Sequence, residues 1–372
     1  MLKLVLGASG SGKTTLLYAR IRARAEAGKR SILLVPEQFT SSTEARIYRE
    51  LGDALSGMVE SYSFTSLAEH ILAALGGAAV QTLTDAGRAV LVRRALEELQ
   101  DNVHYYYRHR RSAAFCQMAA ETIDELKSAG LSGQQLQELA RDCGSESAKL
   151  GELALIFQGY ESLLAGTGMD PADRLELAAD RLEAALARDE LPDFLREREV
   201  FIDEFDTFNA PKKRLMGAML AALPAVTVAL CEDGAPMQPG DLELFSGAKQ
   251  VAAQLRQLAR KNGAQVAAPE LLRRDLRHKD APGLAALTEL LETGSCTPPE
   301  SAPELRLFAA ASREEEARCA AAAIRRLMRQ GVRCGKIAVV CRDISLYRAA
   351  VRYEFRMAEI PLYCDEPTTP EF

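Results

Sequence analysis

A glycine-rich stretch near the N-terminus has the residue types of a phosphate-binding loop. Residues 7–14 read GASGSGKT and fit the pattern G-x-x-x-x-G-K-[ST]. Glycines let successive backbone N–H groups face an anion, and the positive end of a following helix strengthens the attraction. In this pattern the lysine reaches the outer phosphates of a nucleotide, and the hydroxyl of Thr14 holds Mg²⁺. The residues predicted to bind the nucleotide are Gly7, Ala8, Ser9, Gly10, Ser11, Gly12, Lys13, Thr14 and Thr15.

A glycine-rich turn that contains Lys-Thr by coincidence is the competing interpretation. From average residue usage, a chance match in a chain of this length has a probability on the order of one in a hundred. The flanking sequence makes coincidence rarer, because an apolar run precedes the loop and a helical pattern follows it. The pattern therefore predicts nucleotide binding.

Two acidic residues end an apolar stretch in the middle of the chain. Residues 200–204 read VFIDE, which is typical of a buried strand followed by two carboxylates. In P-loop NTPases the first acid holds Mg²⁺, and the second orients or deprotonates the attacking water. Acids at strand ends are often only solvated loop residues, but beside a phosphate-binding loop they favour a catalytic pair. We predict Asp203 and Glu204 as catalytic residues, with Thr14 and Asp203 as metal ligands.

A parallel α/β fold would position both groups. The apolar runs predict strands at 2–6, 31–35, 199–202 and 226–230. A helix from residue 13 to about residue 27 follows the glycine-rich loop, and Gly28 is placed to end it. Two further helices are predicted to open at capping boxes formed by Ser41 with Glu44 and by Ser66 with Glu69. Strand, loop, helix and strand in this order predict a parallel α/β unit.

The pattern changes along the chain and predicts several domains. From about residue 84 to residue 188 only helical periodicity is found, and a Pro- and Ser-rich linker covers residues 293–303. Beyond it, strands are predicted at 305–309 and 336–341, with a helix capped by Ser312 and Glu315 between them. We predict a first lobe over 1–83 and 189–235, a helical insertion over 84–188, a helical connection and linker over 236–302, and the truncated beginning of a second lobe over 303–372.

Composition and charge exclude several classes of protein. The 372 residues are 48% hydrophobic and 26% charged, as in ordinary globular proteins rather than disordered or fibrous ones. Forty-six basic and 52 acidic residues give a net charge of −6, which argues against a free-standing nucleic-acid binder. The eight cysteines have no zinc-site spacing, so we expect reduced thiols and a cytoplasmic location. No apolar run approaches the ~18 residues that span a membrane, so we expect no membrane partner.

Residues 105–111, YYYRHRR, join three tyrosines to a local charge of +3 from Arg108, Arg110 and Arg111. Such a segment could stack on bases and pair with phosphates. The alternative, which we favour slightly at this point, is a loop or helix end with a solvated basic face.

The motifs together resemble known DNA-processing proteins. Residues 10–14, Arg20-Ile21, residues 203–206 and Asn209 resemble superfamily 1 helicases of the UvrD/Rep type. The chain is also similar to the AddB (RexB) family, which supplies one of the two chains of bacterial AddAB helicase–nucleases. That likeness rests on blocks in the same order and at similar spacing, at residues 33–40, 63–68, 123–130, 337–343 and 360–366.

The resemblance implies an α/β fold in which a P-loop NTPase (RecA-like) lobe carries a helical insertion and is followed by the start of a second RecA-like lobe. It implies ATP and Mg²⁺ as ligands and a position for Arg20 near the base or sugar of the nucleotide. It also implies contacts with single-stranded DNA in two segments, through Gln38, Thr40, Ser63, Phe64 and Thr65.

At the level of function, the resemblance implies the ATP-binding, helicase-like region of an ATP-dependent helicase/deoxyribonuclease in double-strand break repair and recombination. The partners would be an AddA-type helicase–nuclease subunit, in a heterodimer, and single- and double-stranded DNA. A nuclease domain with an iron–sulfur cluster would lie downstream of residue 372. ATP hydrolysis by this part alone should be weak, because phosphoryl transfer needs charge stabilisation from both lobes.

One departure from the helicase pattern keeps other functions open. Residues 231–234, Cys-Glu-Asp-Gly, stand where helicases have Gly-Asp-x-x-Gln, so a glutamine that senses the γ-phosphate is in doubt. The glycine-rich loop is also compatible with a P-loop kinase or other phosphotransferase. A third alternative is a structural lobe that binds nucleotide without turnover.

Overall fold

A parallel sheet organises the N-terminal part of the chain. The computed structural model describes residues 1–77, 82–236 and 244–364, and the chain divides into two units, Met1–Asp280 and Ala281–Phe372. In the described part of the first unit the sheet has six strands in the order β3-β2-β4-β5-β1-β6, all parallel. The strands are β1 Leu2–Gly7, β2 Ser31–Leu34, β3 Val59–Tyr62, β4 Glu199–Ile202, β5 Ala225–Cys231 and β6 Glu270–Leu272.

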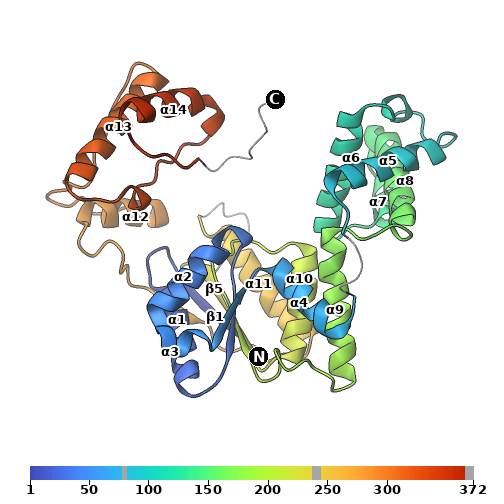
Figure 1. The fold of residues 1–372 in the computed structure, drawn as a ribbon, viewed down its shortest axis with the longest axis horizontal. Coiled ribbons are helices and arrows are strands. Elements are labelled where there is room, and N and C mark those ends of the chain that lie inside the picture. Colours follow the sequence, from blue (N-terminus) through green and yellow to red (C-terminus); the bar gives the residue numbers. More distant parts are fainter. Residues whose placement is uncertain (78–81, 237–243, 365–372) are drawn as a thin grey trace. The chain divides into compact units, whose positions relative to one another are not determined.

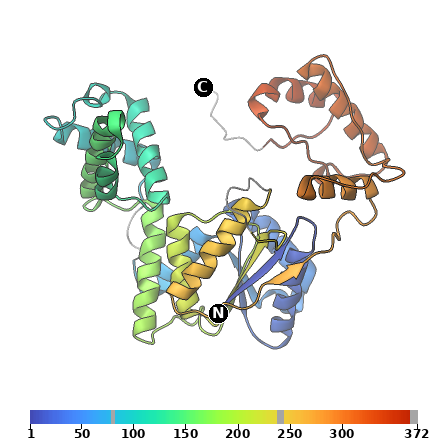
Figure 2. The same cartoon turned by 180° about the vertical axis from the view of Figure 1, so that it is seen from behind.

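Helices cover both faces of this sheet (Figure 1), and Figure 2 shows the same arrangement from behind. In chain order the helices of the first unit are α1 Lys13–Glu26, α2 Thr40–Leu51, α3 Asp53–Ser56, α4 Phe64–Leu75, α5 Asp85–Glu98, α6 Ala113–Ser128, α7 Gly133–Ala140, α8 Ser147–Leu164, α9 Pro171–Ala187, α10 Ala210–Ala222 and α11 Ser246–Lys261. Short 3₁₀ turns lie at Glu37–Phe39, Tyr107–His109 and Gly144–Glu146.

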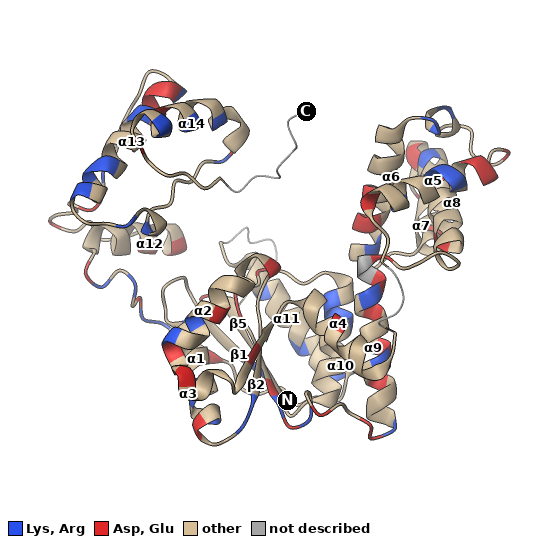
Figure 3. Ribbon diagram, in the orientation of Figure 1, with Lys and Arg blue, Asp and Glu red and all other residues tan. Residues whose placement is uncertain are grey.

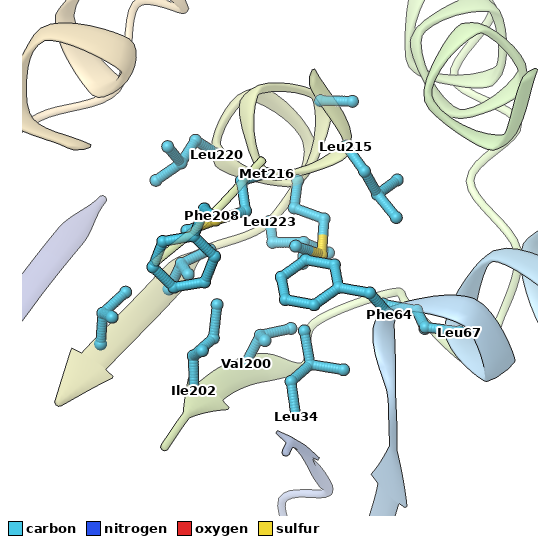
Figure 4. Packing of buried hydrophobic residues seen from close by; sticks show 14 of the residues in the cluster. Leu34, Phe64, Leu67, Val200, Ile202, Phe208, Leu215, Met216, Leu220 and Leu223 are labelled. Carbon is cyan, nitrogen blue, oxygen red and sulfur yellow. The ribbon is translucent and has the colours of Figure 1, made fainter. Parts of the chain in front are cut away.

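The two faces of the sheet are filled by alternate residues of each strand, as a period of two requires. On β1, Leu4 and Leu6 join one core and Val5 joins the other. The core around Val5 is completed by α1, α2 and α3. The larger core is completed by α4, α9, α10 and α11, and Figure 4 shows α4 and α10 packed there against β2 and β4. Both faces of the sheet are therefore buried, which explains why its inner strands β1, β2, β4 and β5 read as continuous apolar runs.

The predicted α/β fold with a parallel sheet is confirmed, and the four predicted strands correspond to β1, β2, β4 and β5. Strands β3 and β6 were not predicted. Residues 59–62 read VESY, which is not an apolar run, and β6 has three residues at the sheet edge within a range predicted as helical connection. The first segment is too polar and the second is too short to be predicted as a strand from sequence alone.

Two of the predicted helix caps differ from the observed ones. Helix α2 begins at Thr40 without a side-chain cap, so Ser41 and Glu44 already lie inside it. Helix α4 is capped one turn earlier than predicted, by a box between Ser63 and Ser66. Ser63 has the extended backbone that a cap requires, because it directly follows β3, whereas Ser66 is already helical.

Helices α5 to α8 form a helical bundle with a core of its own, which includes Phe157 and Tyr160. The chain enters and leaves this bundle at neighbouring points. Thr82 forms a β-bridge with Met169, and the backbone N–H of Leu83 donates to the carbonyl of Met169 at 3.1 Å. Helix α9 falls within the predicted insertion 84–188, yet it packs against α4 and α10 in the core of the sheet.

A buried ionic network lies where this bundle meets α9. The Nζ of Lys127 lies 2.8 Å from Asp170 Oδ2 and 2.9 Å from Asp173 Oδ2. The Tyr160 hydroxyl donates to Asp170 Oδ1 at 2.7 Å. Lys127 lies on α6, Tyr160 lies on α8, and Asp170 caps α9, so the network joins these three helices. Loss of Lys127 would leave the buried Asp170 carboxylate without its cation, which is unfavourable.

The second unit contains α12 Pro282–Thr293, α13 Arg313–Arg329 and α14 Arg348–Met357, with short 3₁₀ turns at Cys334–Lys336 and Ile344–Leu346. Helices α13 and α14 share a small apolar core that includes Ile324, Val351 and Phe355. The predicted cap of α13 is confirmed, because the backbone N–H of Glu315 donates to Ser312 Oγ.

The strands predicted at 305–309 and 336–341 are not found. A strand needs a ladder of hydrogen bonds to a neighbour, and no strand is assigned to either segment within the described residues. Leu307 is 99% exposed and Val340 is 89% exposed, so the apolar character that suggested buried strands is not buried here. The assignment of residues 303–372 to a second RecA-like lobe stays a prediction.

Basic and acidic residues are interspersed along the helices (Figure 3), in keeping with the small net charge. Among the described residues, no helix combines the length and the apolar character needed to cross a membrane.

Candidate nucleotide-binding site

The glycine-rich loop connects the carboxyl end of β1 with the first turn of α1. Helix α1 begins at Lys13, and Gly12 caps it with a φ of 93°. Gly10 has a φ of 82°, and a Cβ atom there would lie 2.8 Å from the Cβ of Arg277. Both positions therefore favour glycine. Gly12 permits the turn into the helix, and Gly10 permits both its positive φ and the close packing against Arg277. The backbone N–H groups of the first turn of α1 lie at the positive end of its dipole.

A pocket of about 510 Å³ lies over this loop. It brings together most of the residues predicted from the two motifs. From the loop and the start of α1 the lining residues are Ser9, Gly10, Gly12, Lys13, Thr14 and Thr15, and from the end of β4 they include Asp203 and Glu204. The lysine, the hydroxyl and the two carboxylates expected from the sequence thus line the wall of one cavity.

Two polar side chains of the loop, those of Lys13 and Ser11, differ in their hydrogen bonding. The Nζ of Lys13 donates to the carbonyls of Gly7 and Ala8 at 2.7 and 2.8 Å, so it is folded onto the loop. The Oγ of Ser11 is buried and has no hydrogen-bond partner among the described residues. A buried hydroxyl without a partner is unfavourable, and an anion held in the loop would supply one.

The two carboxylates differ in their surroundings. Asp203 is buried, its backbone N–H donates to the carbonyl of Leu34 at 3.1 Å, and its Oδ1 accepts from the backbone N–H of Glu204 at 3.0 Å. Glu204 has a φ of 65°, which turns the chain sharply where β4 ends. Partial burial and the charge of Asp203 together raise the pKa of the Glu204 carboxyl above its ordinary value. A raised pKa brings a carboxylate closer to the range suited to a general base.

Arg46 on α2 is a residue of this site that the sequence did not reveal. It lines both the main pocket and a smaller pocket of about 230 Å³, and Thr14, Asp203 and Glu204 line both as well. Its guanidinium carbon lies 5.0 Å from the centre of the Tyr18 ring, in cation–π geometry. Its Nε is buried without a hydrogen-bond partner among the described residues. The Arg46 charge opposes the rise in the pKa of Glu204.

Removing the Arg46 charge should therefore shift the pH dependence of any reaction that uses Glu204 as a base. We expect Arg46→Ala to raise the pKa of Glu204 further, so that the acidic limb of a pH–rate profile for ATP hydrolysis moves to higher pH. Arg49→Ala, on the same helix and at the wall of the smaller pocket, is the matched control and should leave the limb in place. An unchanged limb in Arg46→Ala would contradict the electrostatic role.

The segment that follows β6 also lies against the loop. The backbone N–H of Leu276 donates to the carbonyl of Gly10 at 3.0 Å, and Arg277 Nη1 lies 3.1 Å from Ser9 Oγ. Asp275 Oδ1 accepts from the backbone N–H groups of Arg277 and His278, which fixes the turn. In the sequence this segment shows only as a basic run at 273–278. Its position beside the loop follows from the pairing of β6 with β1, which the sequence did not predict.

Arg20 is not among the residues that line the main pocket. It forms an ion pair with Glu270, at the edge where β6 pairs with β1. Its predicted contact with the base or sugar of a nucleotide stays a prediction.

The end of β5 does not supply the glutamine of the helicase pattern. Cys231 lines the pocket, whereas Glu232 is buried and its Oε2 has no hydrogen-bond partner among the described residues. Burial raises the pKa of the Glu232 carboxyl, and the nearby cations Arg256 and Lys249 partly oppose this.

The residues predicted to contact DNA have different exposures. Gln38 and Thr65 are exposed, and the Thr65 hydroxyl donates to Glu37 Oε1 at 2.9 Å, so the two predicted segments touch. Thr40 is half-buried at the start of α2. Ser63 is buried as the cap of α4, and Phe64 is 1% exposed.

Phe64 has a packing role in this structure. Its ring lies 5.3 Å from that of Phe205 and 6.0 Å from that of Phe208, with edge-to-face geometry in both pairs. A ring held in this way offers no free face to a base. Gln38, Thr40 and Thr65 are therefore the members of the predicted set whose side chains solvent reaches.

No group of three or more His, Cys, Asp or Glu side chains able to hold a metal ion was found in the described ranges. The predicted Mg²⁺ ligands, Thr14 and Asp203, line the same pocket, and Mg²⁺ at nucleotide sites takes most of its other ligands from phosphates and water. The cysteines from Cys116 to Cys341 are free thiols.

Comparisons with known proteins show which family the chain is similar to. The family model described as ADDB, N-terminal matches residues 4–288. Three relatives, each named as the B subunit of an ATP-dependent helicase/deoxyribonuclease, come from Desulforudis audaxviator, Moorella thermoacetica and Symbiobacterium thermophilum. They are 34%, 33% and 32% identical to this chain, over 98%, 98% and 99% of its length and 32% of each relative.

The chain therefore spans about a third of the length of these curated relatives. The match to the family model covers well over half of the chain and includes both the glycine-rich loop and the two carboxylates at the end of β4. On this ground the protein belongs to the AddB family, of which it carries the N-terminal region.

Proposed function

We propose that residues 1–280 form a RecA-like P-loop lobe that binds ATP with Mg²⁺. One observation carries this proposal: Lys13, Thr14, Asp203 and Glu204, which come from two motifs far apart in the sequence, line one pocket at the carboxyl ends of β1 and β4. This edge of a parallel sheet is where α/β proteins bind their ligands.

Each residue has a role in the proposed reaction. Lys13 would exchange its loop carbonyls for the outer phosphates, and Thr14 and Asp203 would hold Mg²⁺. The ion, when bound, neutralises charge that develops on the phosphates. Glu204 would orient the attacking water and accept its proton, which its raised pKa favours. Arg277, at 3.1 Å from Ser9 Oγ, adds a cation at the wall of the pocket.

For the whole protein, we propose that it acts as the B subunit of an ATP-dependent helicase/deoxyribonuclease in double-strand break repair and recombination. The names of the relatives support this interpretation. Its partners would be an AddA-type subunit and single- and double-stranded DNA, in the cytoplasm. An iron–sulfur cluster would belong to a nuclease domain outside this chain. Alone, the chain would be at most a weak ATPase, because cations from a second lobe are needed for full charge stabilisation.

Calorimetric titration of the chain with ATP tests the nucleotide site. We expect binding in Mg²⁺ that weakens when EDTA removes the metal, because Thr14 and Asp203 hold ATP through the ion. Binding that is absent, or equally strong without metal, would contradict the proposed site. Turnover of small phosphate acceptors without DNA would favour a phosphotransferase instead.

A further inference from the structure

The loop between α5 and α6 presents aromatic and basic side chains at the surface of the helical bundle. It contains the YYYRHRR segment and a 3₁₀ turn, Tyr107–His109. The loop is anchored at two points. Val103, just before it, is fully buried, and the ring of Tyr106 stacks on that of Phe115 with 5.6 Å between the ring centres. The proposed nucleotide pocket uses none of these residues.

A single carboxylate holds the backbone of this loop. The oxygens of Glu152 on α8 accept hydrogen bonds from the backbone N–H groups of His104, Tyr105 and Tyr106, at distances from 2.8 to 3.1 Å. Partial burial alone would raise the pKa of Glu152, but these N–H groups outweigh it and lower the pKa. The loop is therefore set in one conformation before any ligand binds, which reduces the entropy lost on binding.

Of the three tyrosines, Tyr105 is the one whose ring is exposed and can stack on a ligand. Tyr105 is 52% exposed, and the ammonium of Lys149 lies 5.4 Å from its ring centre. The guanidinium of Arg110 lies 3.9 Å from the ring centre of Tyr107. Flat rings beside cations are the combination on which unpaired bases and their phosphates are held.

Two arginines of the loop differ from those on the neighbouring helix α5. Arg93 and Arg94 form ion pairs with Glu97 and Glu98 one turn further along α5. Arg108 and Arg111 are exposed and make no ion pair within the part of the chain that is described. The arginines of α5 are thus neutralised by carboxylates, whereas Arg108 and Arg111 beside the tyrosines can bind an external anion.

We propose that the loop of residues 104–111 binds single-stranded nucleic acid, with Tyr105 stacking on a base and Arg108 and Arg111 contacting phosphates. A single strand fits better than a duplex, because its bases expose their faces. An acidic protein segment would use the guanidinium groups but not the tyrosine ring. The surface is separate from the predicted DNA segments of the sheet unit, and the inference does not rest on nucleotide binding at Lys13.

Tryptophan fluorescence gives a local test, because the chain contains no tryptophan. Tyr105→Trp introduces a single reporter, which a stacked base quenches. We expect a thymidine 20-mer to quench it in low salt and without nucleotide, and an abasic oligomer of equal length to quench it much less. Tyr353→Trp, on α14 and 61% exposed, is the control and should not respond.

The arginines are tested by salt dependence of the same signal. Arg108→Ala and Arg111→Ala should each reduce the slope of log affinity against log salt by about 0.7, the value for one phosphate contact on a single strand. Arg93→Ala and Arg94→Ala are matched controls and should leave the slope unchanged. Glu152→Gln should weaken binding, because the loop loses the carboxylate that orders it.

The outcomes separate the proposal from its alternatives. No quenching by the 20-mer, or equal quenching by the abasic oligomer, would overturn base stacking at Tyr105. Equal quenching by a poly-glutamate peptide would assign the surface to an acidic protein. Because the readout needs no ATP, failure here leaves the nucleotide site untouched, and a Lys13→Ala chain should give the same quenching as the parent.

Discussion

Lys13→Ala is expected to weaken ATP binding by about 10- to 100-fold, as a hydrogen bond to a charged group contributes about 1.5–3 kcal/mol. The Nζ of Lys13 already bonds to the carbonyls of Gly7 and Ala8, so no large movement separates it from a phosphate held in the loop. Alanine keeps the first turn of α1, because it is a strong helix former. The substitution should therefore weaken ATP binding without unfolding α1.

Calorimetric titration with ATP and Mg²⁺ measures this loss directly. Lys29→Ala, just beyond the opposite end of α1 and exposed, is the matched control and should bind as the parent chain does. Circular dichroism should give the same spectrum for all three chains. If Lys13→Ala bound ATP as tightly as the parent, the loop would not be the nucleotide site.

Glu204→Gln should separate hydrolysis from binding. The amide keeps the shape of the side chain but cannot accept a proton from water, and a positioned general base contributes about 10²- to 10⁴-fold to a rate. We therefore expect DNA-stimulated ATP hydrolysis by the full-length protein with its partner subunit to fall by about that factor. ATP affinity should stay within about twofold, because Glu204 does not hold phosphate in the proposed mechanism.

Asp206→Asn provides the control for this change. Asp206 is also exposed and lines the same pocket, two residues further along the chain. Its neutralisation alters the charge of the pocket by the same amount without touching the proposed base. Equal loss of hydrolysis in both variants would mean that general electrostatics, not proton transfer at Glu204, sets the rate.

The glycine-rich turn between β1 and α1 could be predicted because its pattern is local, whereas its binding of phosphate stays a proposal. The residues from Gly7 to Thr14 are consecutive, so neighbouring residues alone determine the conformation of the turn. The position of Asp203 could be predicted for a related reason, since a carboxylate directly after an apolar run marks the end of a buried strand. The parallel sheet followed from the alternation of apolar runs and helical patterns.

Arg46 and Arg277 could not be predicted, because their places depend on long-range pairing. Arg46 reaches the site because α2 packs in the same core as α1. The sequence of α2 around it is that of an ordinary amphipathic helix. Arg277 reaches it only because β6 adds to the edge of β1. Periodicity reports which face of an element is buried, but it does not report which element lies next to it.

Phe64 illustrates the opposite difficulty. A resemblance between short blocks placed it among DNA contacts, whereas its ring packs on Phe205 and Phe208 in the core. An aromatic residue beside polar ones is equally compatible with stacking on a base and with capping a core. Only the burial of the ring distinguishes the two.

The bridge between Thr82 and Met169 makes the helical bundle a replaceable part of the chain. Because the points of departure and return are neighbours, excision of residues 84–168 and closure by a short turn would leave every strand and the glycine-rich loop in sequence. The excised chain would lose Lys127 and Tyr160, and Asp170 would be a buried carboxylate without its cation. A minimal ATP-binding version of this protein would therefore need Asp170→Asn as well, and the bundle itself could be exchanged for another without redesign of the sheet.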